Sequence, residues 1–337
     1  MVRQRQLTAM GGAAHLIVHA ASARTARAAL DAATARIAVL EQRWSRFQPD
    51  NELALLARAA GRAVAVSHDT RLLVACCLRA WRFSGGRFDA TVLDALERLG
   101  YDRSFSCPPG SPLPDLASIG GRGTPGGPIR HGAGTASGTA RTRGGNGISL
   151  DARTGTAAFP AGVRLDPGGL GKGLAADLAS AAGMAAGALG ACVNLAGDVR
   201  ARGAAAPPTG PAGDGDPAAS GRWVVGVEHP LNPGKVLDLV TLPRGGGAVA
   251  SSSVLLRRWG PGSHHIIDPA RGIPAQSPVV AVTTIATKAV WADAATKIAL
   301  VEPDPEVSRT LLTRLGFSAL LVLADGTELR TGPSPGR

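Results

Sequence analysis

Cysteine, lysine and aromatic residues are all scarce in this chain of 337 residues. The four cysteines, at positions 76, 77, 107 and 192, show no CxxC spacing, which argues against a zinc site and against a disulfide scaffold. Because Cys76 and Cys77 lie in an apolar helical pattern, we expect buried thiols in a reducing compartment. No run of about twenty apolar residues occurs, so the sequence predicts a protein that is not integral to a membrane.

The net charge of +11 raises the question of nucleic-acid binding. Only four of the 36 basic residues are lysine, and the arginines are spread along the chain without interleaved aromatic residues. This distribution argues against nucleic acid as a partner. The first twenty residues contain no continuous apolar run before a small-residue cleavage site, which predicts a cytoplasmic protein, with extracytoplasmic action at a membrane left open.

Apolar periodicity predicts helices that alternate with many short strands. Helices are expected at 22–47, 68–83, 92–99, 173–189, 292–300 and 305–315. Strands are expected at 15–20, 62–67, 147–150, 162–166, 192–197, 222–229, 236–242, 264–268, 279–286 and 319–323. Strands of antiparallel character with helices in groups indicate an α+β fold.

Two segments, at about 106–147 and 204–221, are rich in small residues and proline and have few large apolar residues. Such segments cannot bury enough surface to offset their ordering entropy, so we expect them to be mostly disordered. We interpret them as loop insertions in a single domain of residues 1–330, followed by a disordered tail at 331–337.

The stretch "RLDPGGLGKGLAADLAS" (164–180) is the strongest chemical motif. A glycine-rich turn ends at Lys172, where a helix begins, so backbone amides and an ammonium could bind a diphosphate together. Gly173 occupies the place of the Ser or Thr that follows the lysine in a Walker A loop, which excludes that motif. A tight turn with a surface lysine is the alternative.

Two further stretches place an aspartate at a helix start. In "SGGRFDATV" (84–92) Asp89 could contact a ligand or simply cap the helix. In "VWADAATKIALV" (290–301) Asp293 and Thr296 are three residues apart, so both oxygens could reach one hard cation. Capping is the alternative here too.

Nine stretches in this order resemble the ApbE family, the FAD:protein FMN transferases. They are "AMGG" (9–12), "EQRWSRFQPDNEL" (41–53), "SGGRFDATV" (84–92), "LDPGGLGKGLAADLA" (165–179), "VNLAGDVRARG" (193–203), "WVVGVEHP" (223–230), "AVASSSVLLRRW" (248–259), "HHIIDPARGIPA" (264–275) and "WADAATKIALV" (291–301). The resemblance covers about residues 9–325 apart from the two insertions. It implies a T-fold-like α+β fold with mixed, largely antiparallel sheets and a flavin site between lobes.

The resemblance also implies a magnesium-dependent transferase that uses FAD as substrate. Such an enzyme cleaves the FAD pyrophosphate, transfers FMN to a threonine or serine hydroxyl of an acceptor flavoprotein with an FMN-binding domain, and releases AMP. The implied FAD contacts are Met10, Phe47, Arg87, Phe88, Asp89, Lys172, Ala175, Ser252 and His265. The implied metal ligands are the Gly169 carbonyl, Asp293 and a nearby threonine, for which Thr296 is the candidate.

Three residues are candidates for catalysis. Lys172 could neutralise the phosphates, His265 could activate the acceptor hydroxyl, and Asp268 could orient the site. Because side chains alternate along a strand, His264 is expected to point away from His265.

One departure from the family pattern concerns the metal. The family's usual motif has a threonine four residues after the aspartate, whereas Lys297 stands there in this chain and Thr296 is one residue short. A lysine directed at a cation site would repel the metal, unless it points at phosphate instead. This departure leaves open an FAD-binding carrier, or an FAD pyrophosphatase of the same fold that has lost acceptor transfer. A small-ligand binding protein whose glycine turn holds phosphate is a third interpretation.

Overall fold

The computed structural model describes residues 1–102, 142, 144–207, 221–259 and 262–332. Its centre is an eight-stranded sheet whose neighbouring strands all pair antiparallel. In spatial order the strands are β1 (Val2–Ala9), β2 (Gly12–His19), β6 (Gly190–Leu195), β7 (Asp198–Gly203), β10 (Gly246–Ser253), β13 (Val279–Ala286), β14 (Ser318–Leu323) and β15 (Glu328–Thr331). The predicted α+β class with largely antiparallel sheets is confirmed.

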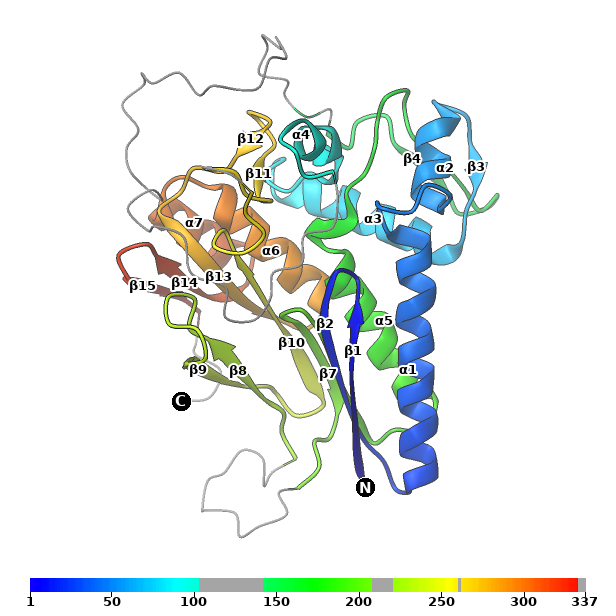
Figure 1. The fold of residues 1–337 in the computed structure, drawn as a ribbon, viewed down its shortest axis with the longest axis vertical. Helices are drawn as coiled ribbons and strands as arrows, with labels where there is room; N and C mark the ends of the chain where they lie inside the picture. Colours follow the sequence, from blue (N-terminus) through cyan, green and yellow to red (C-terminus); the bar gives the residue numbers. More distant parts are fainter. Residues whose placement is uncertain (103–141, 143, 208–220, 260–261, 333–337) are drawn as a thin grey trace.

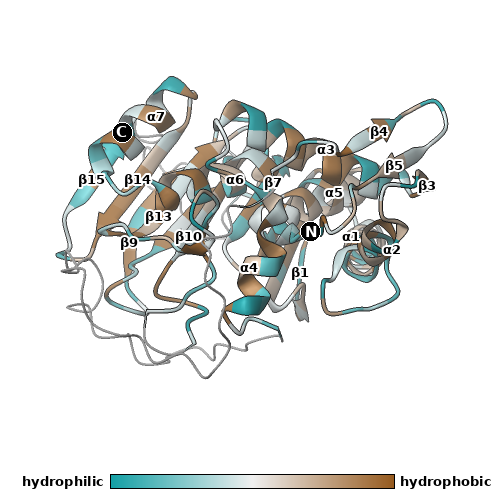
Figure 2. Cartoon of the chain, turned by 90° about the horizontal axis from the view of Figure 1, so that it is seen from above, coloured by the Kyte–Doolittle hydropathy of each residue, from teal (hydrophilic) through white to brown (hydrophobic). Residues whose placement is uncertain are grey.

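Four helices pack on one face of this sheet (Figure 1). They are α1 (Ala23–Trp44), α5 (Gly171–Ala185), α6 (Ala289–Val301) and α7 (Pro305–Arg314). The other face carries a hairpin of β8 (Val224–Glu228) and β9 (Val236–Thr241), whose Val227 and Val240 pack with Val199 of β7 and Val249 of β10. In Figure 2 the strands β13 and β14 are coloured largely as hydrophobic, as expected for strands covered on both faces.

Smaller elements lie beside one end of the helices. They are α2 (Glu52–Ala59), α3 (His68–Phe83), α4 (Leu93–Arg98), two 3₁₀ turns at Ala90–Val92 and Pro167–Gly169, the short sheet of β3 (Val64–Ala65), β5 (Thr156–Ala158) and β4 (Ser149–Asp151), and the pair β11 (Ile267–Asp268) and β12 (Ile273–Pro274). Within the described ranges no helix is both long and apolar enough to cross a membrane.

Helices α5 and α6 approach each other closely, and two features make this possible. Gly173 has no side chain, and a Cβ there would lie 2.4 Å from the carbonyl oxygen of Ala289. Asp177 of α5 accepts the backbone N–H groups of Ala289 (3.2 Å) and Val290 (3.0 Å), which begin α6. Because no side chain of α6 itself caps its N-terminus, Asp177 satisfies amides that would otherwise be buried without a partner.

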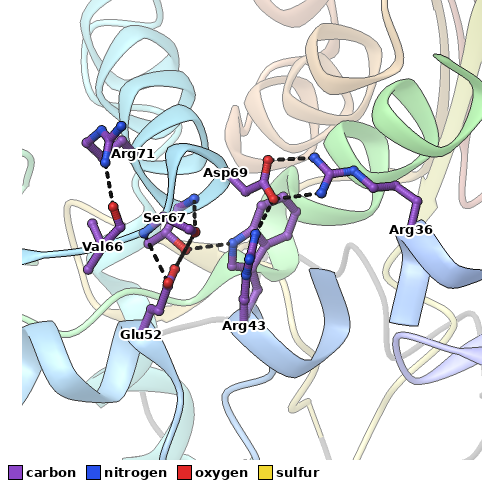
Figure 3. A network of polar contacts seen from close by, with 9 residues as sticks. Arg36, Arg43, Glu52, Val66, Ser67, Asp69 and Arg71 are labelled. Carbon is purple, nitrogen blue, oxygen red and sulfur yellow. Dashed lines mark hydrogen bonds and ion pairs between the residues drawn. The ribbon is translucent and has the colours of Figure 1, made fainter. Parts of the chain in front are cut away.

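A polar network fixes α3 against α1 and α2 (Figure 3). The Asp69 carboxylate accepts hydrogen bonds from both guanidinium nitrogens of Arg36, at 2.7 and 2.5 Å, and from Arg43. The Arg36 hydrogen bonds, together with the charges of Arg36 and Arg43, lower the pKa of Asp69 despite its burial. Glu52 accepts from the backbone N–H of Ser67 at 3.0 Å, which links α2 to the start of α3.

The structure corrects several sequence predictions of local structure. Residues 163–165 form no strand although 162–166 was predicted to be one: Val163 and Leu165 are buried without a partner strand. Seven elements within the described ranges were not predicted at all: the strands β1, β5, β7, β10, β12 and β15 and the helix α2. The predicted strand at 264–268 shrinks to Ile267–Asp268.

The predicted insertions lie mostly outside the described residues. Their limits were too wide: Thr142 donates its backbone N–H to the Pro269 carbonyl at 3.0 Å, and residues 144–147 form a turn. The predicted tail also began too early, because Thr331 belongs to β15 and donates its hydroxyl to the Phe317 carbonyl at 2.7 Å. Cys76, Cys77 and Cys192 are buried free thiols as expected, and Cys107 lies outside the described residues.

Candidate functional site

A cavity of about 450 Å³ lies where the β1–β2 turn, the end of α1, the start of α5 and the segment 265–269 meet. The elements β1, β2, α1, α5 and β11, which carry or adjoin these segments, are labelled in Figure 1. Of the residues that the sequence analysis selected, it is lined by Met10, Phe47, Arg87, Phe88, Asp89, Gly169, Lys172 and His265. Segments far apart in the sequence therefore converge on one cavity, as the proposed flavin site requires.

Five selected residues are not among those that line the cavity. Ala175 is fully buried in α5, Asp293 and Ser252 accept hydrogen bonds from Lys297, and Thr296 contacts Ser252. The Asp268 carboxylate accepts the backbone N–H of Ala270 at 2.9 Å and so stabilises the turn that follows β11. Its role in orienting the catalytic groups stays a prediction.

The β1–β2 turn brings Met10 to the cavity. Met10 and Gly11 both have positive φ angles, 51° and 73°, which suits a two-residue hairpin turn between right-twisted strands. The backbone N–H of Met10 donates to Glu41 Oε1 at 2.7 Å, which ties the turn to the last part of α1. The turn, and with it the Met10 side chain, is therefore held at a fixed place on the cavity wall.

Aromatic rings make the apolar side of the cavity. Phe47 meets Tyr101 edge to face with 6.5 Å between ring centroids, and Tyr101 stacks on Trp259 at 4.8 Å. Phe88 lies under the glycine turn, where a Cβ on Gly169 would be 2.8 Å from the phenyl ring. Rings of this kind suit a flat aromatic ligand, because aromatic pairs are stabilised beyond the burial of their area.

Lys172 forms a buried ion pair at the start of α5. Its ammonium donates to Asp198, which lies at the start of β7. Burial alone would lower the pKa of Lys172, but the carboxylates of Asp198 and Asp293 outweigh burial and raise it. Lys172 is therefore a permanent cation on the cavity wall, beside a helix N-terminus that no side chain caps.

Two of the three proposed metal ligands, Asp293 and Thr296, are already engaged with other partners. Lys297 donates to Asp293 Oδ1, and the backbone N–H of Gly173 donates to Asp293 Oδ2 at 3.1 Å. Thr296 Oγ1 donates to the Asp293 carbonyl at 2.7 Å and lies 2.8 Å from Ser252 Oγ. In the part of the chain that the structure describes, no group of three or more His, Cys, Asp or Glu side chains could hold a metal ion. This donor set does not fit a divalent cation, because an ammonium stands at its carboxylate.

His265 is the buried imidazole of the cavity. Burial lowers its pKa well below the usual value, and the positive charges of Arg257, Lys297 and Lys172 lower it further. Its Nδ1 is buried and has no hydrogen-bond partner in the part of the chain that the structure describes. His265 is thus neutral near pH 7, with a nitrogen able to accept a proton from a ligand. His264 does not line the cavity but lies 3.1 Å from the Ala275 carbonyl through Nε2, so the two histidines do diverge.

Arg46 is a functional candidate that the sequence analysis missed. Its guanidinium lies 3.9 Å from the Tyr101 ring centroid and 4.7 Å from that of Phe47. Arg46 lines the cavity, yet both of its terminal nitrogens are buried and make no hydrogen bond to the residues that the structure describes. Buried guanidinium donors are normally satisfied, so two open donors here indicate a place for an anionic ligand.

Arg257, Tyr101 and Asp198 were missed as well. Arg46, Asp198 and Arg257 lie inside stretches that resemble the family, but nothing in their spacing distinguishes them from other arginines and aspartates. The glycine before Asp198 offered a weak signal, since a strand followed by "AGD" indicates a hairpin that places the aspartate at a strand start.

Comparisons with known proteins concern the chain as a whole and its fold. The chain is 31% identical over 183 residues to the FAD:protein FMN transferase of Treponema pallidum (strain Nichols), and the match spans 53% of this chain and 49% of that relative. The fold is similar to the ApbE protein of Thermotoga maritima MSB8 (TM-score 0.76, 23% identity, 98% of this chain and 97% of that chain). It is also similar to the Pseudomonas stutzeri flavinyl transferase ApbE in its apo form (TM-score 0.71, 21% identity, 98% and 94%). The pattern that defines the ApbE family matches residues 10–321, and the chain belongs to this family.

Proposed function

We propose that this protein is an FAD:protein FMN transferase whose substrate FAD binds in the cavity. Family membership and the transferase relative support the reaction class. The observation that carries the proposal is the convergence of Lys172, Lys297 and Arg257 around His265, beside the open donors of Arg46. Several cations that surround a neutral base in a partly apolar cavity suit a ligand with two linked phosphates and a flat ring system.

The chain's own residues would divide the work of binding. Lys172 and the N-terminal amides of α5 hold the diphosphate, and the Arg46 guanidinium donates to a phosphate oxygen. The rings of Phe47 and Tyr101, with Met10, contact the flat parts of FAD. Positive charge then balances the charge that develops on the non-bridging oxygens during transfer.

The transfer itself is an exchange at one phosphorus. The hydroxyl oxygen of a threonine or serine in an acceptor flavoprotein bonds to the FMN-side phosphorus, and the bond from that phosphorus to the bridging oxygen breaks. AMP leaves with the bridging oxygen, and the hydroxyl proton passes to Nδ1 of His265. A neutral imidazole is needed for this step, and the lowered pKa of His265 provides it.

Magnesium takes no part in the proposed reaction. The resemblance implies a magnesium site at Gly169, Asp293 and a threonine, but the Asp293 carboxylate binds the Lys297 ammonium and the Gly173 amide. The cationic side chains supply the positive charge in each step above.

Incubation with FAD and an FMN-binding domain that carries a threonine acceptor tests the proposal. We expect flavin fluorescence on the denatured acceptor and AMP in equal amount, with neither product from an acceptor whose threonine is replaced by alanine. His265→Gln should retain FAD binding and lose transfer. AMP together with free FMN would instead identify a pyrophosphatase, bound FAD without turnover a carrier, and absence of FAD binding would reject both the transferase and these alternatives.

A further inference from the structure

Lys297 occupies an unusual place for a lysine. It lies on α6 one turn after Asp293, and its side chain is only 12% exposed. Its ammonium donates to Asp293 Oδ1 and, at 2.8 Å, to Ser252 Oγ. The same side chain lines the cavity and lies close enough to lower the pKa of His265 by its charge.

The oxygen atoms around this ammonium are those that a hard cation would use. Asp293 contributes a fully buried carboxylate, and Ser252 and Thr296 contribute hydroxyls 2.8 Å apart. An ammonium has three N–H donors, and two of them are directed at Asp293 and Ser252. The third remains for an oxygen atom of a ligand in the cavity.

We propose that Lys297 is a built-in cation that takes the place of a divalent metal ion against the diphosphate of FAD. This inference rests on the proposed function, because it assumes FAD as the ligand. A tethered ammonium is always present at the site, repels a metal ion that approaches Asp293, and donates a charge-assisted hydrogen bond to a phosphate oxygen. Binding of FAD by this chain is therefore independent of magnesium.

Metal binding to the protein without flavin is the first arm of the test. Manganese(II) is titrated into the wild type, Lys297→Thr and the exposed-lysine control Lys235→Thr, with the bound ion read by electron paramagnetic resonance. We expect Mn²⁺ to bind to Lys297→Thr, which restores an oxygen donor, and not to the wild type or the control. Adding Asp293→Asn to Lys297→Thr should abolish this Mn²⁺ binding. Mn²⁺ binding by the wild type that Asp293→Asn abolishes would overturn the proposal.

Flavin binding is the second arm. The dissociation constant of FAD is measured by quenching of flavin fluorescence, once with EDTA and once with excess Mg²⁺. The wild type and Lys235→Thr should differ by less than about twofold between the two conditions. Lys297→Thr should bind about tenfold more weakly in EDTA, as expected for the loss of one charge-assisted hydrogen bond, and recover with Mg²⁺.

A second variant covers the case in which Lys297→Thr fails to fold. Lys297→Met combined with Asp293→Asn removes both buried charges, and we expect weak FAD binding that Mg²⁺ does not restore. A wild type whose FAD affinity rises tenfold or more with Mg²⁺ would refute the built-in cation. If the wild type binds no FAD at all, the proposed function fails, while the manganese arm still decides whether Lys297 excludes the metal.

Discussion

Two clusters of charged residues in this protein differ in whether their polar groups find partners within the protein. At the junction of α1 and α3, Asp69 accepts hydrogen bonds from Arg36 and Arg43, so its carboxylate is satisfied within the protein (Figure 3). At the cavity, both terminal nitrogens of Arg46 and Nδ1 of His265 are buried and have no hydrogen-bond partner among the described residues. Because buried polar groups are normally hydrogen-bonded, the difference separates a cluster that stabilises the fold from one that is completed by a ligand.

The largest effect is expected from Lys172→Met. This change leaves Asp198 buried without its cation, which should cost about 3–5 kcal/mol of unfolding free energy. It also removes a phosphate-binding cation, so FAD affinity should fall about a hundredfold or more. Adding Asp198→Asn should restore stability in urea titrations without restoring FAD affinity, and joint recovery of both would show that Lys172 is only structural.

Acid should separate Asp69 from the two buried histidines, His264 and His265, by the pH windows in which they affect stability. Burial lowers the pKa of His264 to about 4 and that of His265 well below its usual value. Below pH of about 6.5 the unfolded chain binds protons that these buried imidazoles do not, so stability falls as pH falls, by up to about 3 kcal/mol for His264. The pKa of Asp69 is lowered, so its contribution is complete above pH of about 4 and is lost only below it.

Urea unfolding from pH 7 to pH 3 measures these windows. His264→Gln should flatten the fall in stability between pH 6.5 and 4, whereas Asp69→Asn should flatten it only below about pH 4. A wild-type stability that is constant from pH 6.5 to 4.5 would contradict the buried neutral histidines.

Asp69→Ala tests whether the Asp69 cluster contributes to stability and not to FAD binding. It removes hydrogen bonds to two arginines that are partly exposed, so the unfolding free energy should fall by about 2 kcal/mol. The FAD affinity of the folded variant should be unchanged, because Asp69 does not line the cavity. A tenfold loss of affinity in a fully folded variant would show that the two clusters are coupled.

Arg46→Met should have the smallest effect on stability. In contrast to Asp69→Ala, it should weaken FAD binding. Its terminal nitrogens make no hydrogen bond to the described protein, and its Nε lies 3.9 Å from Asp166 Oδ1, at the outer limit of an ion pair, so stability should change by about 1 kcal/mol. FAD affinity should fall about tenfold through the loss of a charge-assisted hydrogen bond. Arg43→Met is the matched control, since it should weaken folding and leave FAD binding intact; equal FAD affinity in both variants would remove Arg46 from the site.

The sequence predicted those elements of the fold whose pattern lies within a few neighbouring residues. The apolar stripe of α1 and the glycine turn before α5 were found because their residues are close in sequence. The strand β1 was missed because it is an edge strand with mostly exposed polar residues. Residues 163–165 were taken for a strand because their buried valine and leucine mimic one, although the core covers them without backbone pairing.

The residues that line the cavity were predicted in part, and the contacts between their side chains were not predicted. Lys172 and His265 were selected correctly as residues of one cavity, yet their partners come from other elements. Asp198 is 26 residues from Lys172, and the contact depends on how α5 packs over β7. The engagement of Asp293 by Gly173 likewise follows from the packing of α5 on α6, which a spacing of residues does not encode.

The most direct test of the central claim compares FAD with riboflavin, which shares the flavin ring and lacks both phosphates. Each is titrated into the wild-type protein in EDTA, and the dissociation constants are read from flavin fluorescence. If the cavity cations bind the diphosphate, FAD should bind at least about a hundredfold more tightly, as expected for two or more charge-assisted hydrogen bonds. Equal affinity for the two flavins would contradict the account.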